Sequence, residues 1–201
     1  IVDEVDSILV DEARTPLLDG VTPSTKKRQF LRYFSAGEQR QLVAVAARLL
    51  EQAGAAAPRA FRAGSFGFNA DTLGALHAHG IAVDASYNAT MFGPDSGVAP
   101  GQLLTDSCGI GPMIELPMTV FHDGLGRLRH VQLTACSWRE IEALLWQALA
   151  RGQRSFVILS HGSELLDRTR RRPDDVVVSR FDRLCAFLAR HRDSFQLRCF
   201  D

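Results

Sequence analysis

The chain has 201 residues, of which 46% are hydrophobic and 23% are charged, and its 23 basic side chains balance its 23 acidic ones. A chain of this length buries about 70% of its unfolded surface, so it needs neither a disulfide nor a structural metal to fold. The composition excludes a disordered chain or a collagen-like rod, and the neutral charge balance argues against a nucleic-acid-binding face.

No apolar stretch reaches the about 18 residues that a membrane-spanning helix needs, and no secretory leader is recognisable, so we expect a soluble chain without a membrane span. Export is left open, and the sequence does not indicate a compartment. The cysteines are widely spaced and form no Cys-x-x-Cys pair, which favours buried free thiols over a zinc ribbon or a redox pair. They are Cys108, Cys136, Cys185 and Cys199.

Helices and strands alternate in the first half of the chain. Ser35 and Glu38 have the spacing of a capping box and precede apolar residues at helical intervals, which predicts a helix over residues 36–53. Three more elements are expected before residue 88, namely a strand over residues 59–63, a helix over 70–79 and a strand over 81–87. The glycines and prolines of residues 88–112 predict a long loop.

The second half continues the alternation. Residues 113–121 are expected to form an edge strand, because Pro117 cannot donate a hydrogen bond to a neighbouring strand. Ser137 and Glu140 repeat the capping-box spacing and predict a helix that ends near residue 151. Residues 155–160 are apolar on both faces, which predicts a central parallel strand. The last expected elements are a helix over residues 175–192 and a strand over 195–200.

This order of elements is typical of an α/β domain with a mainly parallel sheet, either open or rolled into a partial or irregular (β/α) barrel. In such folds, ligands bind at the carboxyl ends of the strands. The predicted strand ends therefore nominate candidate site residues, which are Arg62, Gly64, Asp84, Tyr87, Ser160, His161 and Glu164.

His161 is the strongest candidate for a catalytic residue, because an imidazole can donate a proton to a leaving group near neutral pH. Arg62 is the second, because a guanidinium can hold the carboxylate of a substrate or of a catalytic base. The alternatives are a histidine that bonds its own loop and an arginine in a surface ion pair. Gly64, Asp84 and Tyr87 are candidates for binding the substrate.

Several separated segments resemble, in the same order, the bacterial polysaccharide deacetylases of the NodB-homology type. The resemblance covers about residues 15–201 and rests mainly on residues 60–69, 84–88, 115–117, 132–137 and 156–161. It implies an irregular (β/α) barrel that removes acetyl groups from N-acetylated sugars with a divalent metal, most commonly zinc. It also implies that His161 protonates the departing amine and that Arg62 orients a catalytic aspartate.

The metal ligands that this reaction needs are not found in the sequence. The family takes an aspartate and two histidines from its N-terminal half, where this chain has Asp3, Glu4 and Asp6. We interpret the chain as a single deacetylase-like domain over residues 1–201 that lacks the metal-binding half. The alternative is that these three carboxylates supply oxygen ligands to a metal.

Residues 2–17 resemble a different family. Their sequence, VDEVDSILVDEARTPL, is similar to the Walker B segment of the Sec preprotein-translocase motor ATPase. Walker B carboxylates act together with a Gly-Lys-Thr phosphate loop, which the sequence does not contain. We therefore treat residues 1–20 as an atypical leader segment.

The sequence thus predicts metal-dependent hydrolysis of N-acetyl groups on a polysaccharide, weakened by the absent metal ligands. The expected partner is an N-acetylated polysaccharide or oligosaccharide, and unpaired strand edges favour self-association. Two alternatives stay open: a non-catalytic domain that binds glycans, and a fragment of a nucleotide-dependent translocase motor.

Overall fold

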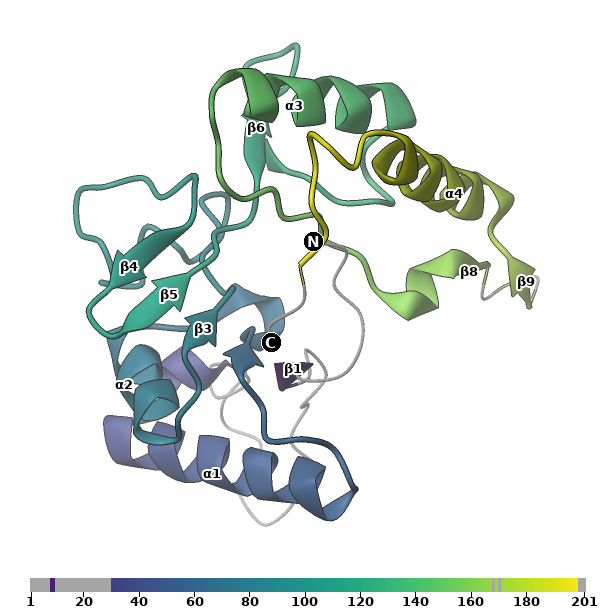
Figure 1. Cartoon of the computed structure of the whole chain (residues 1–201). Coiled ribbons are helices and arrows are strands. Elements are labelled where there is room, and N and C mark those ends of the chain that lie inside the picture. Colours follow the sequence, from purple (N-terminus) through teal and green to yellow (C-terminus); the bar gives the residue numbers. More distant parts are fainter. Residues whose placement is uncertain (1–7, 10–29, 168, 170, 199–201) are drawn as a thin grey trace. The chain divides into compact units, whose positions relative to one another are not determined.

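The computed structural model describes residues 8–9, 30–167, 169 and 171–198 (Figure 1). Contacts between Cα atoms divide these residues into two compact units, with the boundary between Pro117 and Met118. We call the described residues before this boundary the N-terminal unit and those after it the C-terminal unit. Each unit has its own hydrophobic core.

Helices in the N-terminal unit begin at local capping motifs. The Ser35 side chain accepts a hydrogen bond from the Glu38 backbone, and the Glu38 side chain accepts one from the Ser35 backbone, which satisfies two free donors at the start of α1. Asn69 and Thr72 cap α2 in the same way. The two longer helices pack against each other. The helical elements are η3 (Leu31–Tyr33), α1 (Ala36–Gln52), η4 (Gly64–Phe66) and α2 (Ala70–Ala78).

The sheet of the N-terminal unit is mainly parallel and is built from very short strands. Its spatial order is β1 (Ile8–Leu9), β2 (Ala60–Phe61), β3 (Val83–Asp84), β5 (Met113–Glu115) and β4 (Cys108–Ile110). The first four are parallel, and β4 is antiparallel to β5. Phe61, Asp84 and Glu115 are partners in one row across three strands. The carboxyl ends of these strands therefore meet at one edge of the sheet.

The C-terminal unit combines two hairpins with two helices. Its elements are β6 (Val120–His122), β7 (Leu128–His130), α3 (Trp138–Ala150), η5 (Gly162–Leu165), β8 (Leu166–Asp167), β9 (Arg172–Pro173) and α4 (Asp175–Arg190). The β6–β7 turn is closed by the Asp123 carboxylate, which accepts hydrogen bonds from the backbone N–H groups of Leu125 and Arg127 at 2.9 and 3.0 Å. Helices α3 and α4 pack against each other and bury Ile141 and Leu184.

The predicted helices are confirmed, and three predicted strands need correction. The strand expected over residues 113–121 is interrupted at Pro117, and β5 and β6 belong to different sheets. Residues 155–160 form an isolated parallel bridge between Gln132 and Leu159 instead of a full strand. Residues 195–198 form no strand. The long loop expected over residues 88–112 contains β4.

The reason that residues 155–160 form so little sheet lies in their hydrogen bonds. The Val157 backbone N–H donates to the Thr119 side-chain oxygen at 2.7 Å, which replaces a bond to a neighbouring strand. Backbone bonds join Leu159 to Val131 and Leu133, both at 2.9 Å. The chain is a mixed α/β protein, as predicted, but the strands in the described part form no closed barrel, so the barrel is not confirmed.

Two further sequence expectations can be compared with the described residues. None of their helices combines the length and the apolar character that crossing a bilayer requires. Three of the cysteines are free thiols, as expected, but they differ in burial: Cys136 is buried, Cys108 is half-buried and Cys185 is exposed. Cys199 lies outside the described residues.

Candidate functional site

His161 stands at the end of a buried extended segment in the C-terminal unit. Residues 157–160 are buried, and His161 is the first partly exposed residue after them, with one third of its side chain accessible. The backbone bonds of Leu159 fix this segment against residues 131–133. A histidine in this position combines a rigid attachment with access to solvent.

Glu164 lies in the short turn that follows and contacts the imidazole directly. Its Oε1 atom is 3.1 Å from His161 Nδ1, and its Oε2 atom accepts a hydrogen bond from the His161 backbone N–H at 3.4 Å. The turn η5 is closed by the Glu164 backbone N–H, which donates to the His161 carbonyl at 2.8 Å. Three contacts thus join two residues that are three positions apart in the sequence.

Gln132 holds the Glu164 carboxylate from the other side. Its side-chain amide donates to Glu164 Oε1 at 2.8 Å, so the same oxygen contacts both the glutamine and the imidazole. Gln132 also forms the parallel bridge with Leu159, which lies two residues before His161. Gln132 therefore fixes both the backbone that leads to the imidazole and the carboxylate that orients it.

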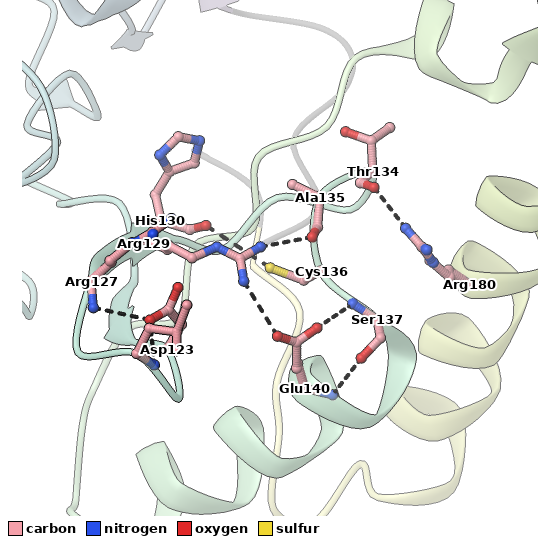
Figure 2. Close-up of polar contacts among 11 residues, drawn as sticks. Asp123, Arg127, Arg129, His130, Thr134, Ala135, Cys136, Ser137, Glu140 and Arg180 are labelled. Carbon is pink, nitrogen blue, oxygen red and sulfur yellow. Dashed lines mark hydrogen bonds and ion pairs between the residues drawn. The ribbon is translucent and has the colours of Figure 1, made fainter.

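Two arginines stabilise the turn after Gln132 (Figure 2). Arg129, on β7, donates to the Ala135 carbonyl at 2.8 Å and reaches the Glu140 carboxylate at 3.4 Å. Arg180, on α4, donates to the Thr134 carbonyl at 2.7 Å. Because each guanidinium satisfies carbonyls that no strand or helix pairs, the segment can turn sharply between the bridge at Gln132 and the start of α3.

Cys136 lies within this turn but has the wrong environment for a nucleophile. Its sulfur is 4.0 Å from the His130 carbonyl oxygen, and burial raises the pKa of the thiol. Since the thiolate is the reactive form, this environment favours a structural role. His161 and Glu164 are the better candidates for chemistry in the C-terminal unit.

The N-terminal unit places a second group of polar residues at the carboxyl ends of its parallel strands. Arg62 follows β2 directly and is buried. Asp84 ends β3, and its Oδ1 atom accepts a hydrogen bond from the Ser86 hydroxyl at 2.6 Å. The Ser86 oxygen in turn accepts the Ala63 backbone N–H at 2.8 Å, which connects the segments that follow β2 and β3.

Glu115 ends β5 and pairs with Asp84 in the interior. Both side chains are fully buried, and the two residues are direct partners on neighbouring parallel strands. Burial raises the pKa of Asp84 to about 6, and burial together with the charge of Asp84 raises the pKa of Glu115 well above its usual value. Two adjacent buried carboxyl groups cannot both ionise readily, so the protonated form is favoured in this pair.

The remaining predicted substrate-binding residues also lie at this edge. Gly64 begins the turn η4, in which Ser65 and Phe66 have left-handed backbone angles, with φ of 51° and 58°. Tyr87 is buried, and its hydroxyl donates to the Gln102 carbonyl at 3.3 Å. Asp84 and Tyr87 are thus both engaged inside the unit, and their roles in substrate binding stay predictions.

One glycine of this turn is required by close packing. A Cβ atom on Gly67 would lie 2.7 Å from the Phe30 Cβ atom. The approaching group at Gly67 is therefore the Phe30 side chain, and a larger residue at this position would require that side chain to shift.

Arg62 and His161 belong to different units. The expectation that they meet at one edge of a sheet therefore stays a prediction. Sequence reasoning did not nominate Glu115 or Gln132. The structure buries Glu115 and exposes the neighbouring Ile114, which is the reverse of what hydrophobicity predicts, so the sequence contains no signal for this carboxylate. No comparable pattern marks Gln132, because its role depends on a contact with a residue 32 positions away.

A metal site is not found among the residues that the structure describes. No group of three or more histidine, cysteine, aspartate or glutamate side chains within them could hold an ion. Asp3, Glu4 and Asp6, the carboxylates considered as alternative ligands, lie outside these residues. The expectation of a bound divalent metal, most commonly zinc, therefore stays a prediction.

Fold and site together define a mixed α/β chain with a histidine–carboxylate pair at the end of a buried segment. A family model described as the SecA DEAD-like domain matches residues 1–51, about a quarter of the chain. Searches of the curated proteins and of the solved structures each found no match. The match includes the Walker B-like residues 2–17 and contains neither Arg62 nor His161.

The predicted membership of the polysaccharide deacetylase family is wrong. No model of that family matches the chain, and the family model that does match belongs to a different family and covers the N-terminal quarter. The resemblance rested on short segments at strand ends followed by turns. Such segments recur in unrelated α/β folds, because the same backbone geometry is needed wherever a parallel strand ends.

Proposed function

We propose that the chain hydrolyses N-acetyl groups on a polysaccharide or oligosaccharide and that His161 is its acid–base residue. The observation that carries this proposal is the pairing of a partly exposed imidazole with the Glu164 carboxylate at 3.1 Å. An amine is a poor leaving group unless its nitrogen is protonated. A histidine held in one orientation at the surface can supply that proton.

The reaction can be written with this residue and water. Neutral His161 accepts a proton at Nε2 from a water molecule whose oxygen attacks the acetyl carbonyl carbon. The resulting imidazolium donates the proton to the amide nitrogen as the carbon–nitrogen bond breaks. Acetate and a free sugar amine leave, and His161 returns to its neutral form.

Acetate release from N-acetylated chito-oligosaccharides tests the proposal. We expect His161→Gln to lower kcat by about 100-fold or more, because general acid–base catalysis contributes roughly that factor. His122→Gln is the matched control, since His122 is an exposed histidine on β6 of the same unit. Equal rates for His161→Gln and the wild type would remove the assigned role, and binding without any turnover would favour a non-catalytic glycan-binding domain.

The match of residues 1–51 favours a second candidate function. This match agrees with the resemblance of residues 2–17 to a translocase motor ATPase. The second candidate is therefore a fragment of a nucleotide-dependent translocase motor that binds ATP. Calorimetric titration of the full chain with magnesium-ATP tests this candidate. Saturable heat would support nucleotide binding, whereas a flat titration would end it.

A further inference from the structure

The carboxylate of Glu164 determines which nitrogen of His161 carries the proton. A carboxylate oxygen only accepts hydrogen bonds, so the 3.1 Å contact requires a proton on Nδ1. In a neutral imidazole the other nitrogen, Nε2, is then the acceptor. Nε2 is the atom from which the proposed reaction takes and returns its proton.

The carboxylate itself is held at both oxygens. Oε1 accepts from the Gln132 amide at 2.8 Å, and Oε2 accepts from the His161 backbone at 3.4 Å. Fewer than one fifth of the Glu164 side chain is exposed. Partial burial and two additional donors keep the carboxylate in one orientation, which an exposed ion pair would not achieve.

A purely structural role for Glu164 has to be weighed against this. The side chain caps η5 in the way that Glu38 caps α1 and Glu140 caps α3, each by accepting from a backbone N–H three residues earlier. Glu164 differs because one of its oxygens also contacts an imidazole and the half-buried Gln132 amide. The local cap needs one acceptor oxygen, and the second oxygen is directed at His161.

We propose that Glu164 is a positioning residue that fixes the Nδ1-protonated tautomer of His161, and that Gln132 fixes Glu164. This inference rests on the proposed function for its catalytic consequence, but the tautomer itself does not depend on any activity. Glu164 does not touch the substrate in this scheme. It acts through the imidazole, by presenting the Nε2 lone pair to the reacting water.

The tautomer can be measured by nitrogen-15 NMR of the full chain at a pH where the imidazole is neutral. In the wild type we expect the His161 Nδ1 shift of a protonated nitrogen and the Nε2 shift of an unprotonated one. In Glu164→Ala we expect the proton to move largely to Nε2, because Nδ1 loses its acceptor. Gln132→Leu should give a mixture of both tautomers. A wild-type spectrum with the proton on Nε2, or an unchanged spectrum in Glu164→Ala, would overturn the proposal.

The kinetic arm separates positioning from folding. We expect Glu164→Ala to lower kcat for acetate release by about 10- to 100-fold with KM nearly unchanged. Glu38→Ala removes the capping glutamate of α1 in the N-terminal unit and should leave kcat and the His161 tautomer as they are. If the wild type releases no acetate, the proposed function fails while the NMR result still decides the role of Glu164. If Glu164→Ala loses the tautomer but keeps kcat, the positioning role is rejected and the function stands.

Discussion

Asp84 and Glu115 are the two residues whose burial has the largest electrostatic consequence. Each is a carboxyl group without exposed surface on neighbouring strands, and burial raises the pKa of both. A folded-state pKa above the ordinary value means that the folded chain binds more protons than the unfolded chain. The stability of the N-terminal unit therefore falls as the pH rises from about 4, where a free aspartate titrates, through the raised pKa of Asp84 at about 6.

The variant Asp84→Asn tests this pH dependence. Removing the titrating group should reduce the loss of stability over this pH range by about 3 kcal/mol, since a shift of one pKa unit corresponds to about 1.4 kcal/mol. The part caused by the burial of Glu115 should persist, whereas the part that the charge of Asp84 adds to the raised pKa of Glu115 should be lost. Urea denaturation at a series of pH values measures the effect, and Asp95→Asn, an exposed aspartate of the same unit, is the control. An unchanged slope in Asp84→Asn would contradict the raised pKa of Asp84.

The candidate site was only partly predictable at the level of single residues. His161, Glu164, Arg62 and Asp84 follow from the rule that strand ends carry site residues. Glu115 is buried on β5, which lies between β3 and β4, and Gln132 required a contact between distant parts of the chain. Side-chain pairs of this kind depend on tertiary packing, which local sequence patterns do not encode.

Helices in this protein are defined by local signals, and strands are not. Three helices begin close to where the sequence predicts them, because side chains cap their first turns. Capping boxes start α1 at Ser35 and α3 at Ser137, and the Asp174 side chain caps α4. Strands of two or three residues depend on partners elsewhere in the chain. The sequence therefore predicted strand positions but overestimated strand lengths.

The hairpin β6–β7 shows a local signal that went unused. Asp123 and Gly124 stand at its turn, and an Asp-Gly pair is typical of a hairpin connection. The single strand expected over residues 113–121 takes no account of this turn. Recognising the turn would have separated β6 from β5 at Pro117.

Ser137→Ala tests the contribution of a capping box at the level of one element. The hydroxyl accepts the Glu140 backbone N–H at 3.3 Å. Its removal leaves a donor unsatisfied at the start of α3 and should lower the free energy of unfolding of the C-terminal unit by about 1 kcal/mol. Chemical denaturation followed by tryptophan fluorescence measures this, with Ser194→Ala, an exposed serine, as the control. A loss no greater than that of the control would mean that packing alone defines the helix start.

At the scale of the whole molecule, two separate cores predict two unfolding transitions. The aromatic residues report on them selectively, because Trp138 and Trp146 belong to the C-terminal unit and Tyr33 and Tyr87 to the N-terminal unit. A core variant should therefore affect one signal and spare the other.

Leu184→Ala tests this division. Leu184 is almost fully buried in the core of the C-terminal unit, and its truncation should cost about 2 to 5 kcal/mol. We expect the transition seen by tryptophan fluorescence to move to lower urea concentration, while the tyrosine signal in near-ultraviolet circular dichroism keeps its midpoint. Coincident shifts of both signals would show that the two units unfold as one.

The central claim is that this chain, through His161, converts an N-acetylated sugar into acetate and a free amine. Proton NMR of an N-acetylated oligosaccharide incubated with the full wild-type chain tests that claim most directly. The account predicts free acetate and deacetylated sugar appearing in equal amounts, at a rate that depends on His161. An oligosaccharide that keeps all its acetyl groups at high protein concentration would contradict it.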